Sequence, residues 1–237
     1  MHRIIMSLKS DQSTDVEYSM RSIVRISFEA GDDLHAEHWP ALCDVLFLRL
    51  RENLAYVAAH LKPDQLQDEE FAKRLQYLNE LALVIRNMSL SLDNAKWFAL
   101  KQNPKDVLTE GLALKHHPIL SEFVVYAMDM VEQMATWLPL KNPNDLLIDA
   151  ILSGLASEDR VMLIGSMRAA CRLINREGIN RLAAVPISTI HRLTAILMLE
   201  DEELVSSCLD FLHQYTADEE NCARLLAPPD GLQITLH

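Results

Sequence analysis

Apolar residues recur every three or four positions along most of the chain. This spacing places them on one face of an α-helix. Residues 81–100 read LALVIRNMSLSLDNAKWFAL, in which a polar break at 91–94 separates a long helical pattern from a short one. The long pattern predicts a buried helical face formed by Leu81, Val84, Ile85 and Met88. Helices as short as the second one are marginal alone in water, so we expect it to pack against its neighbours.

Start and stop signals divide the chain into a succession of helices. We predict them at residues 13–28, 67–89, 93–100, 104–114, 119–137, 188–199, 201–216 and 217–226, with further helices beginning near 40, 142 and 157. Thr14 and Glu17 have the spacing of a capping box. Pro40 suits a first helical turn, and Asp93 and Asn94 suit a helix start. Since the chain has only 6 Gly and no long alternating Val, Ile and Thr runs, we predict an all-α fold.

Prolines and asparagines mark a regular period along this succession. Five prolines are separated by 41, 39, 43 and 42 residues: Pro63, Pro104, Pro143, Pro186 and Pro228. Asn94, Asn180 and Asn221 each follow a helix and a short polar break, at intervals of 86 (twice 43) and 41 residues. A period of about 40–47 residues is typical of armadillo and HEAT repeats. We therefore predict a right-handed α-solenoid of about five armadillo-like units, which forms one domain over residues 1–227, with a frayed tail at 228–237.

Composition narrows the class of protein. The 34 Asp and Glu residues against 22 Lys and Arg give a net charge of −12, whereas domains that bind duplex DNA usually carry a basic face. The four cysteines form no C-x-x-C pair, so we expect free thiols in a reducing compartment. No apolar run reaches about 18 residues, so we expect no membrane span. Met1 leads directly into an amphipathic pattern, which we interpret as the start of a fragment of a longer protein.

Motifs for catalysis and metal binding are incomplete. His35-Ala36-Glu37 has the H-x-E pattern of zinc deaminases and Cys43 lies nearby, but the P-C-x-x-C that such a site requires is absent. The chain also lacks G-x-S-x-G and the two glycine-rich nucleotide motifs. The acidic run 200–203 suits the positive end of a helix dipole better than a docking patch. We therefore expect no catalytic residue, no metal, no cofactor and no small-molecule substrate.

Three stretches carry a resemblance to a known family: HRIIMSLKSDQSTDVEYSMRSIVRISFE, LALVIRNMSLSLDNAKWFA and PISTIHRLTAILMLEDEELVSSCLDFLHQYT. They resemble the armadillo-repeat subunit of RSC/PBAF-type (SWI/SNF) chromatin remodelling complexes, above all its fungal forms. This subunit is related to the AT-rich-interaction-domain proteins. The resemblance implies a scaffold domain of an ATP-dependent remodeller in the nucleus, which binds other subunits of the complex and serves transcription regulation. The family's DNA-binding modules are separate segments, and we find none in this chain.

Alignment of the repeats places Asn87 at one position of the third helix, with Arg25, Leu173 and Gln214 at the same position of other repeats. We expect four residues of the inner face to bind a partner: Arg25, Arg86, Asn87 and Gln214. Peptide-binding armadillo proteins carry a ladder of Asn at this position. Only Asn87 matches that ladder, so a peptide-groove adaptor is the alternative rather than the main hypothesis.

A second alternative is contact with nucleic-acid phosphates along a local basic edge. Its members would be Lys96, Lys101, Lys105 and Lys115. Lysines mostly occupy solvated faces, so we do not expect the fragment to bind nucleic acid. Salt-sensitive duplex binding would support this alternative.

Overall fold

The computed structural model describes residues 1–10, 12–29, 34–62, 68–139, 145–174 and 180–227. Within these ranges the chain forms α-helices and short 3-10 turns and contains no strand, which confirms the predicted all-α fold. None of the described helices is both long and apolar enough to cross a bilayer. The chain divides into two compact units, Met1–Leu140 and Lys141–His237, and each is described by itself. The single domain over residues 1–227 stays a prediction.

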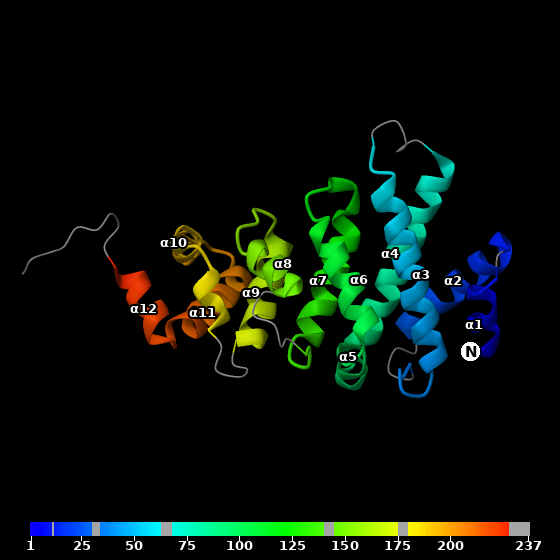
Figure 1. The fold of residues 1–237 in the computed structure, drawn as a ribbon, viewed down its shortest axis with the longest axis horizontal. Coiled ribbons are helices and arrows are strands. Elements are labelled where there is room, and N and C mark those ends of the chain that lie inside the picture. The colour runs from blue at the N-terminus through cyan, green and yellow to red at the C-terminus, as the bar shows by residue number, and fades with distance from the viewer. Residues whose placement is uncertain (11, 30–33, 63–67, 140–144, 175–179, 228–237) are drawn as a thin grey trace, which may run out of the picture. The chain divides into compact units, whose positions relative to one another are not determined.

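The first unit has two layers of helices (Figure 1). One layer consists of α1 (His2–Leu8), α3 (Pro40–Ala59) and α6 (Gln102–Ala113). The other consists of α2 (Ser13–Glu29), α4 (Glu69–Ser89) and α7 (Ser121–Met134), which a 3-10 turn at Pro118–Leu120 precedes. Consecutive helices of a layer are in contact, and α1 with α2, α3 with α4 and α6 with α7 pair across the layers. The short α5 (Leu92–Ala99) contacts α4, α6 and α7.

Helix α4 is buried on several sides because α2, α3 and α7 all contact it. The structure confirms the buried face predicted for this helix, since its four members are at most 1% exposed: Leu81, Val84, Ile85 and Met88. Phe98 anchors α5, because its fully buried ring lies edge-on to the ring of Phe47 in α3, with 5.2 Å between ring centres. Burying one such side chain contributes about 1.5–3 kcal/mol, so α5 is held by its neighbours as expected.

Two predicted helix starts are wrong in detail, although the helices themselves are present. Ser91, not Asn94, occupies the N-cap of α5, and Asn94 is buried. The capping box of Thr14 and Glu17 does not form, because Glu17 accepts a hydrogen bond from Ser13 Oγ at 3.0 Å and lies 3.2 Å from Lys73 Nζ. In both cases contacts with residues distant in sequence replace the helix cap that the local sequence predicted. Pro40 does begin α3, as predicted.

The second unit contains α8 (Leu146–Gly154), α9 (Arg160–Ile174), α10 (Ile187–Ile196), α11 (Glu202–Thr216) and α12 (Glu219–Leu226), with a 3-10 turn at Arg181–Ala184. Helices α8 with α9 and α10 with α11 form pairs, α9 lies against α11, and α12 contacts α10 and α11. The helix predicted to begin near 142 is present as α8, which begins at Leu146. The predicted start itself, the tail at 228–237 and the prolines 63, 143 and 228 lie outside the described residues.

Candidate functional site

A chain of polar side chains connects three helices of the first unit. Asn87 Nδ2 donates to Ser27 Oγ of α2 at 3.2 Å. Its neighbour Arg86 donates from Nε to Asp129 Oδ2 of α7 at 3.0 Å, and from Nη1 to Asn87 Oδ1 at 3.3 Å. We call these four residues, Ser27, Arg86, Asn87 and Asp129, the α2–α4–α7 chain. The structure therefore brings two of the predicted partner-binding residues together and ties them to neighbouring helices.

Arg25 does not join this chain. Residues two apart on a helix face different directions, so Arg25 points away from the buried Ser27. Its side chain is 71% exposed and lies 3.8 Å from Glu29. It belongs instead to an exposed stripe at spacings of three and four residues along α2, which we call the α2 stripe: Tyr18, Arg21, Arg25 and Phe28. The aromatic members are 52% and 66% exposed. Repeat alignment missed them, although helical spacing from Arg25 would have found them.

A second polar contact joins α4 to α7. Asn79 Nδ2 donates to Glu122 Oε2 at 2.7 Å, and Tyr126 donates to the other oxygen of Glu122 at 3.1 Å. Asn79 and Glu122 are 43 residues apart, as are Arg86 and Asp129. These partners could therefore have been predicted from the spacing of the prolines and asparagines, because polar pairs 43 residues apart join successive helices of the layer.

The second unit contains polar contacts at spacings of 41 and 43 residues, both from Arg160. Arg160 donates to both carboxylate oxygens of Asp201 at 2.6 and 2.9 Å, and to Glu203 Oε2 at 2.8 Å. Arg168 also donates to Glu203, at 3.1 Å. Asp201 caps α11 by accepting from the Leu204 backbone N–H at 3.0 Å. These bonds, first of all those from Arg160, lower the pKa of Asp201 to about 2.

The acidic run 200–203 is thus engaged at a helix start, in agreement with its interpretation from the sequence.

Asn221 Nδ2 donates to Asn180 Oδ1 at 3.0 Å, which joins two of the regularly spaced asparagines. Gln214, the remaining predicted partner-binding residue, is half-buried on α11.

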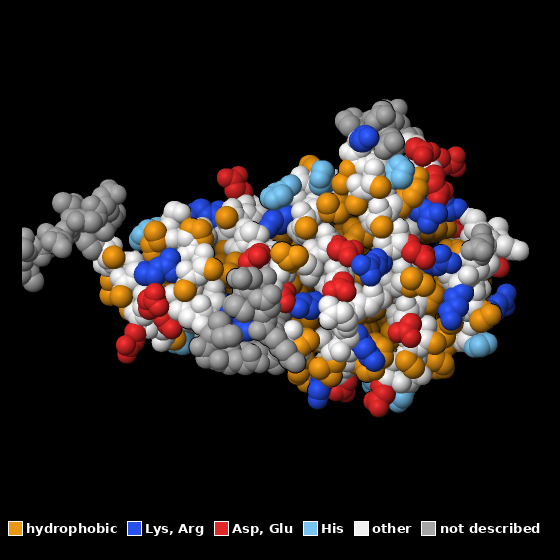
Figure 2. Space-filling view, viewed as in Figure 1, with side chains coloured by type: hydrophobic (Ala, Val, Ile, Leu, Met, Phe, Trp, Pro, Cys, Tyr) orange, Lys and Arg blue, Asp and Glu red, His pale blue; other side chains and the backbone are white. Residues whose placement is uncertain are grey.

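The four lysines of the predicted basic edge do not form one cluster. Lys101, the N-cap of α6, lies over the ring of Trp97, with Nζ 4.5 Å from the ring centre. Lys96 is exposed on α5. Lys105 lies in the first turn of α6, whereas Lys115 follows the end of that helix. Ten residues of helix separate the last two by roughly 15 Å. Burial also lowers the pKa of Lys115. On the face drawn in Figure 2, basic and acidic side chains of the first unit are interspersed rather than gathered by sign.

The zinc-like motif lies beside a hollow of about 400 Å³, whose lining includes His35, Glu37, His38, Asp93 and Trp97. Cys43 is not among the lining residues, and burial raises the pKa of its thiol to about 12. A protonated thiol is a poor metal ligand. Among the residues that the structure describes, no three His, Cys, Asp or Glu side chains are grouped so as to hold a metal ion.

Comparison with solved structures relates the fold to other helical proteins. The crystal structure of an engineered protein superposes with a TM-score of 0.55 at 15% sequence identity, over 90% of this chain and 79% of that chain. At this identity the likeness concerns the fold alone. No family model matches the sequence.

Comparison with curated proteins relates the sequence to a chromatin protein. The chain is 29% identical over 234 residues to the chromatin structure-remodeling complex subunit rsc9 of Schizosaccharomyces pombe. The match covers 98% of this chain but only 29% of rsc9. The chain therefore spans less than a third of the length of this relative.

Proposed function

We propose that this chain is a non-catalytic scaffold segment of a nuclear, ATP-dependent chromatin remodelling complex of the RSC type. The observation that carries the proposal is the similarity to rsc9 along 98% of the chain, since the name of rsc9 describes a subunit of such a complex. The function would be to bind other subunits of the complex, and thereby to serve transcription regulation. The relation to AT-rich-interaction-domain proteins and the fungal character of the sequence belong to the same proposal.

We further infer that the helices belong to armadillo-like repeats, about five in number, in one right-handed domain over residues 1–227. Hydrogen bonds between residues 41 or 43 apart support this inference, because they occur in both units: Asn79–Glu122, Arg86–Asp129, Arg160–Asp201, Arg160–Glu203 and Asn221–Asn180. Each bond joins an element to its counterpart about one period further along the chain. The stacking of such units buries the apolar face that each leaves exposed.

We propose two partner-binding surfaces in the first unit: the α2 stripe, and Arg86 with Asn87, since Asn87 contacts the side of α2 that faces away from Arg25. Arg, Tyr and other aromatic side chains contribute most of the binding energy in protein interfaces, and the α2 stripe presents two Arg and two aromatic side chains. The α2–α4–α7 chain holds α4 against both neighbours, so Arg86 and Asn87 are held in place and lose little conformational entropy on binding. In the second unit Gln214 is the corresponding proposed contact.

The test is affinity purification from nuclear extract with the purified chain as bait, at about 150 mM salt, where exposed charges further apart than about 8 Å are screened. We expect mass spectrometry to find remodeller subunits, and nuclease treatment to leave them bound. Combined Arg25→Ala and Phe28→Ala changes are expected to reduce recovery at least about tenfold. Arg51→Ala is the matched control, because Arg51 is 48% exposed and lies on the other layer, in α3. Recovery of no remodeller subunit by the unaltered chain contradicts the proposal.

A further inference from the structure

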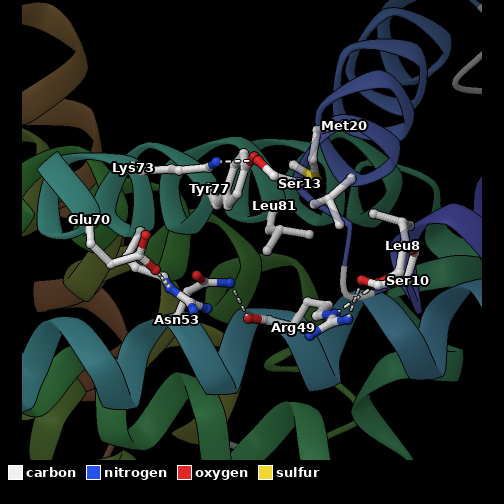
Figure 3. A pocket seen from close by; sticks show the side chains of 12 residues that line it. Leu8, Ser10, Ser13, Met20, Arg49, Asn53, Glu70, Lys73, Tyr77 and Leu81 are labelled. Carbon is white, nitrogen blue, oxygen red and sulfur yellow. Dashed lines mark hydrogen bonds and ion pairs between the residues drawn. The ribbon is translucent and has the colours of Figure 1, made fainter.

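A cleft of about 280 Å³ opens between the α1–α2 junction, α3 and α4 (Figure 3). The cleft exists because α1 and α3, which are neighbours in the same layer, differ in length: α1 has 7 residues and α3 has 20. The shorter helix covers only part of α3, and Arg49 of α3 donates to the Leu8 carbonyl at 2.8 Å, where α1 ends. Beyond that point Asn53 of α3 and the first half of α4 line open space.

Three basic side chains line the cleft, and each is oriented by an acidic partner. Arg49 donates to Glu52 at 2.9 Å and to the Ser10 carbonyl at 3.3 Å. Lys73 donates to Ser13 Oγ and lies 3.2 Å from Glu17. Arg74 donates from Nε to Glu70 at 2.6 Å, with its guanidinium 5.2 Å from the ring centre of Tyr56. Lys73 thus keeps one of its three N–H donors, and Arg74 keeps both terminal Nη groups.

Two further polar groups of the lining are left without a hydrogen bond of ordinary geometry among the described residues. Asn53 is only 4% exposed, and while its Nδ2 donates to the Arg49 carbonyl at 2.7 Å, its Oδ1 accepts no hydrogen bond. The buried hydroxyl of Tyr77 makes no hydrogen bond of ordinary geometry, although it interacts with the Ser13 side chain. Figure 3 shows Tyr77 on α4 and Asn53 on α3 facing the same space. Leaving such groups unpaired destabilises the fold, so they favour a bound molecule that supplies both a donor and an acceptor.

We propose that this cleft binds an acidic residue of an extended protein segment. The carboxylate would accept from Arg74, Lys73 and Tyr77, and the backbone N–H of the same residue would donate to Asn53 Oδ1. Its methylene groups would contact the apolar part of the lining, formed by Leu8, Val16, Met20 and Leu81. Hydrogen bonds to ionised acceptors are roughly twice as strong as neutral ones, which favours a carboxylate over an amide.

Other ligand chemistries satisfy the lining less completely. An inorganic anion has no N–H for Asn53. A basic side chain would be attracted by Glu70, which also lines the cleft. It has donors only, however, so it gives no acceptor to Lys73 or to the terminal Nη groups of Arg74. The inference does not depend on membership of a remodelling complex, because it rests on the geometry of the first unit.

The test is a titration of the isotope-labelled chain, followed by amide chemical shifts, with the blocked peptide Gly-Ser-Glu-Glu-Ser-Gly. We expect saturable shifts confined to residues 10–16, 49–53 and 70–77. The same peptide with both Glu replaced by Gln should bind at least about tenfold more weakly, which corresponds to about 1.4 kcal/mol. A phosphoserine version distinguishes a phosphate source of the anion from a carboxylate. Stronger binding of the phosphoserine version than of the Glu peptide contradicts the proposal.

The second part of the test repeats the titration with substitutions in the cleft. Arg74→Gln and Tyr77→Phe are each expected to weaken binding of the Glu peptide about tenfold. Lys62→Gln is the control, since it removes the same charge from an exposed residue outside the lining. Should the cleft variants lose their fold, the comparison of Glu and Gln peptides on the unaltered chain decides alone. Equal binding of those two peptides, shifts elsewhere on the molecule, or free glutamate binding as tightly as the peptide would each overturn the proposal.

Discussion

At the scale of single residues, Asn94 shows how a local signal can identify the right side chain and assign it the wrong role. Its position after a polar break suggested a helix cap. In the structure Asn94 donates to the carbonyls of Leu34 at 2.8 Å and Met88 at 3.0 Å, and accepts from the Ala36 N–H at 2.7 Å. The regular spacing of Asn94, Asn180 and Asn221 therefore reflects contacts between segments that are distant in sequence. Local propensity contains no information about such partners.

Replacing Asn94 by Ala is expected to lower the free energy of unfolding by about 3 kcal/mol, because it leaves the buried Leu34 carbonyl and Ala36 N–H without partners. The Met88 carbonyl keeps the Ser91 backbone N–H at 3.2 Å. Urea unfolding followed by circular dichroism measures the loss. Asn103→Ala, at a half-buried position of α6, provides the comparison, with an expected change within about 0.5 kcal/mol. Equal changes for the two variants would show that the buried hydrogen bonds contribute nothing specific.

At the scale of helices, the hydrophobic pattern was sufficient to predict most elements. Each helix predicted with both ends is present, and boundaries differ by a few residues, as between 104–114 and Gln102–Ala113. The residues of the α2–α4–α7 chain were predictable only in part. Asn87 came from alignment of the repeats and Arg86 is its neighbour, whereas Ser27 and Asp129 lie on other helices and depend on the lateral register. The cleft depends on the lengths of α1 and α3, and no motif in the sequence records their difference.

The contact between α6 and α7 depends on the absence of a side chain at Gly111. A Cβ at this position would lie 2.5 Å from Cε1 of Phe123. Gly111→Ala is therefore expected to destabilise the chain by about 1–2 kcal/mol, since overpacking costs about 1–3 kcal/mol and alanine regains up to about 1 kcal/mol of helix propensity. Thermal unfolding of both the single variant and the pair with Phe123→Leu checks the cause. The Gly111→Ala change should cost less in the Phe123→Leu background, and an equal cost in both would contradict a clash with this ring.

The pairing of α9 with α11 should depend on pH through Asp201. Its pKa of about 2 in the folded chain lies below the value of about 3.9 for an unfolded Asp. The stabilisation is therefore fully present above pH 4 and is lost as pH falls toward 2. Asp201→Asn keeps a residue suited to the helix cap and removes the charge that Arg160 binds.

We expect the urea midpoint of Asp201→Asn to lie below that of the unaltered chain at pH 5, and the difference to shrink as pH falls. Asp218→Asn is the control, because Asp218 caps α12 without an ion pair among the described residues. A difference between Asp201→Asn and the unaltered chain that stays constant down to pH 2 would contradict the role of the Arg160 contact.

At the scale of the whole molecule, the period read from the sequence predicts which elements stabilise one another. Hydrogen bonds at offsets of 41 and 43 residues join neighbouring elements within each compact unit. In chains built of stacked repeats, stability is approximately a sum of terms between nearest neighbours. A change at one such contact should therefore act on its own unit and leave the other unit nearly unaffected.

Hydrogen exchange on an Asn221→Ala variant tests this locality. The substitution removes the donor to Asn180 Oδ1 and so loosens α12 from the 3-10 turn at Arg181–Ala184. We expect exchange to accelerate in these two segments and to stay unchanged in α3 and α4, because local opening requires no opening of the first unit. Asn94→Ala should give the reverse result: hydrogen exchange should be faster around α4 and α5 and unchanged in α12. If either substitution accelerates exchange throughout both units, the chain opens as one cooperative body, and the nearest-neighbour description of its repeats is wrong.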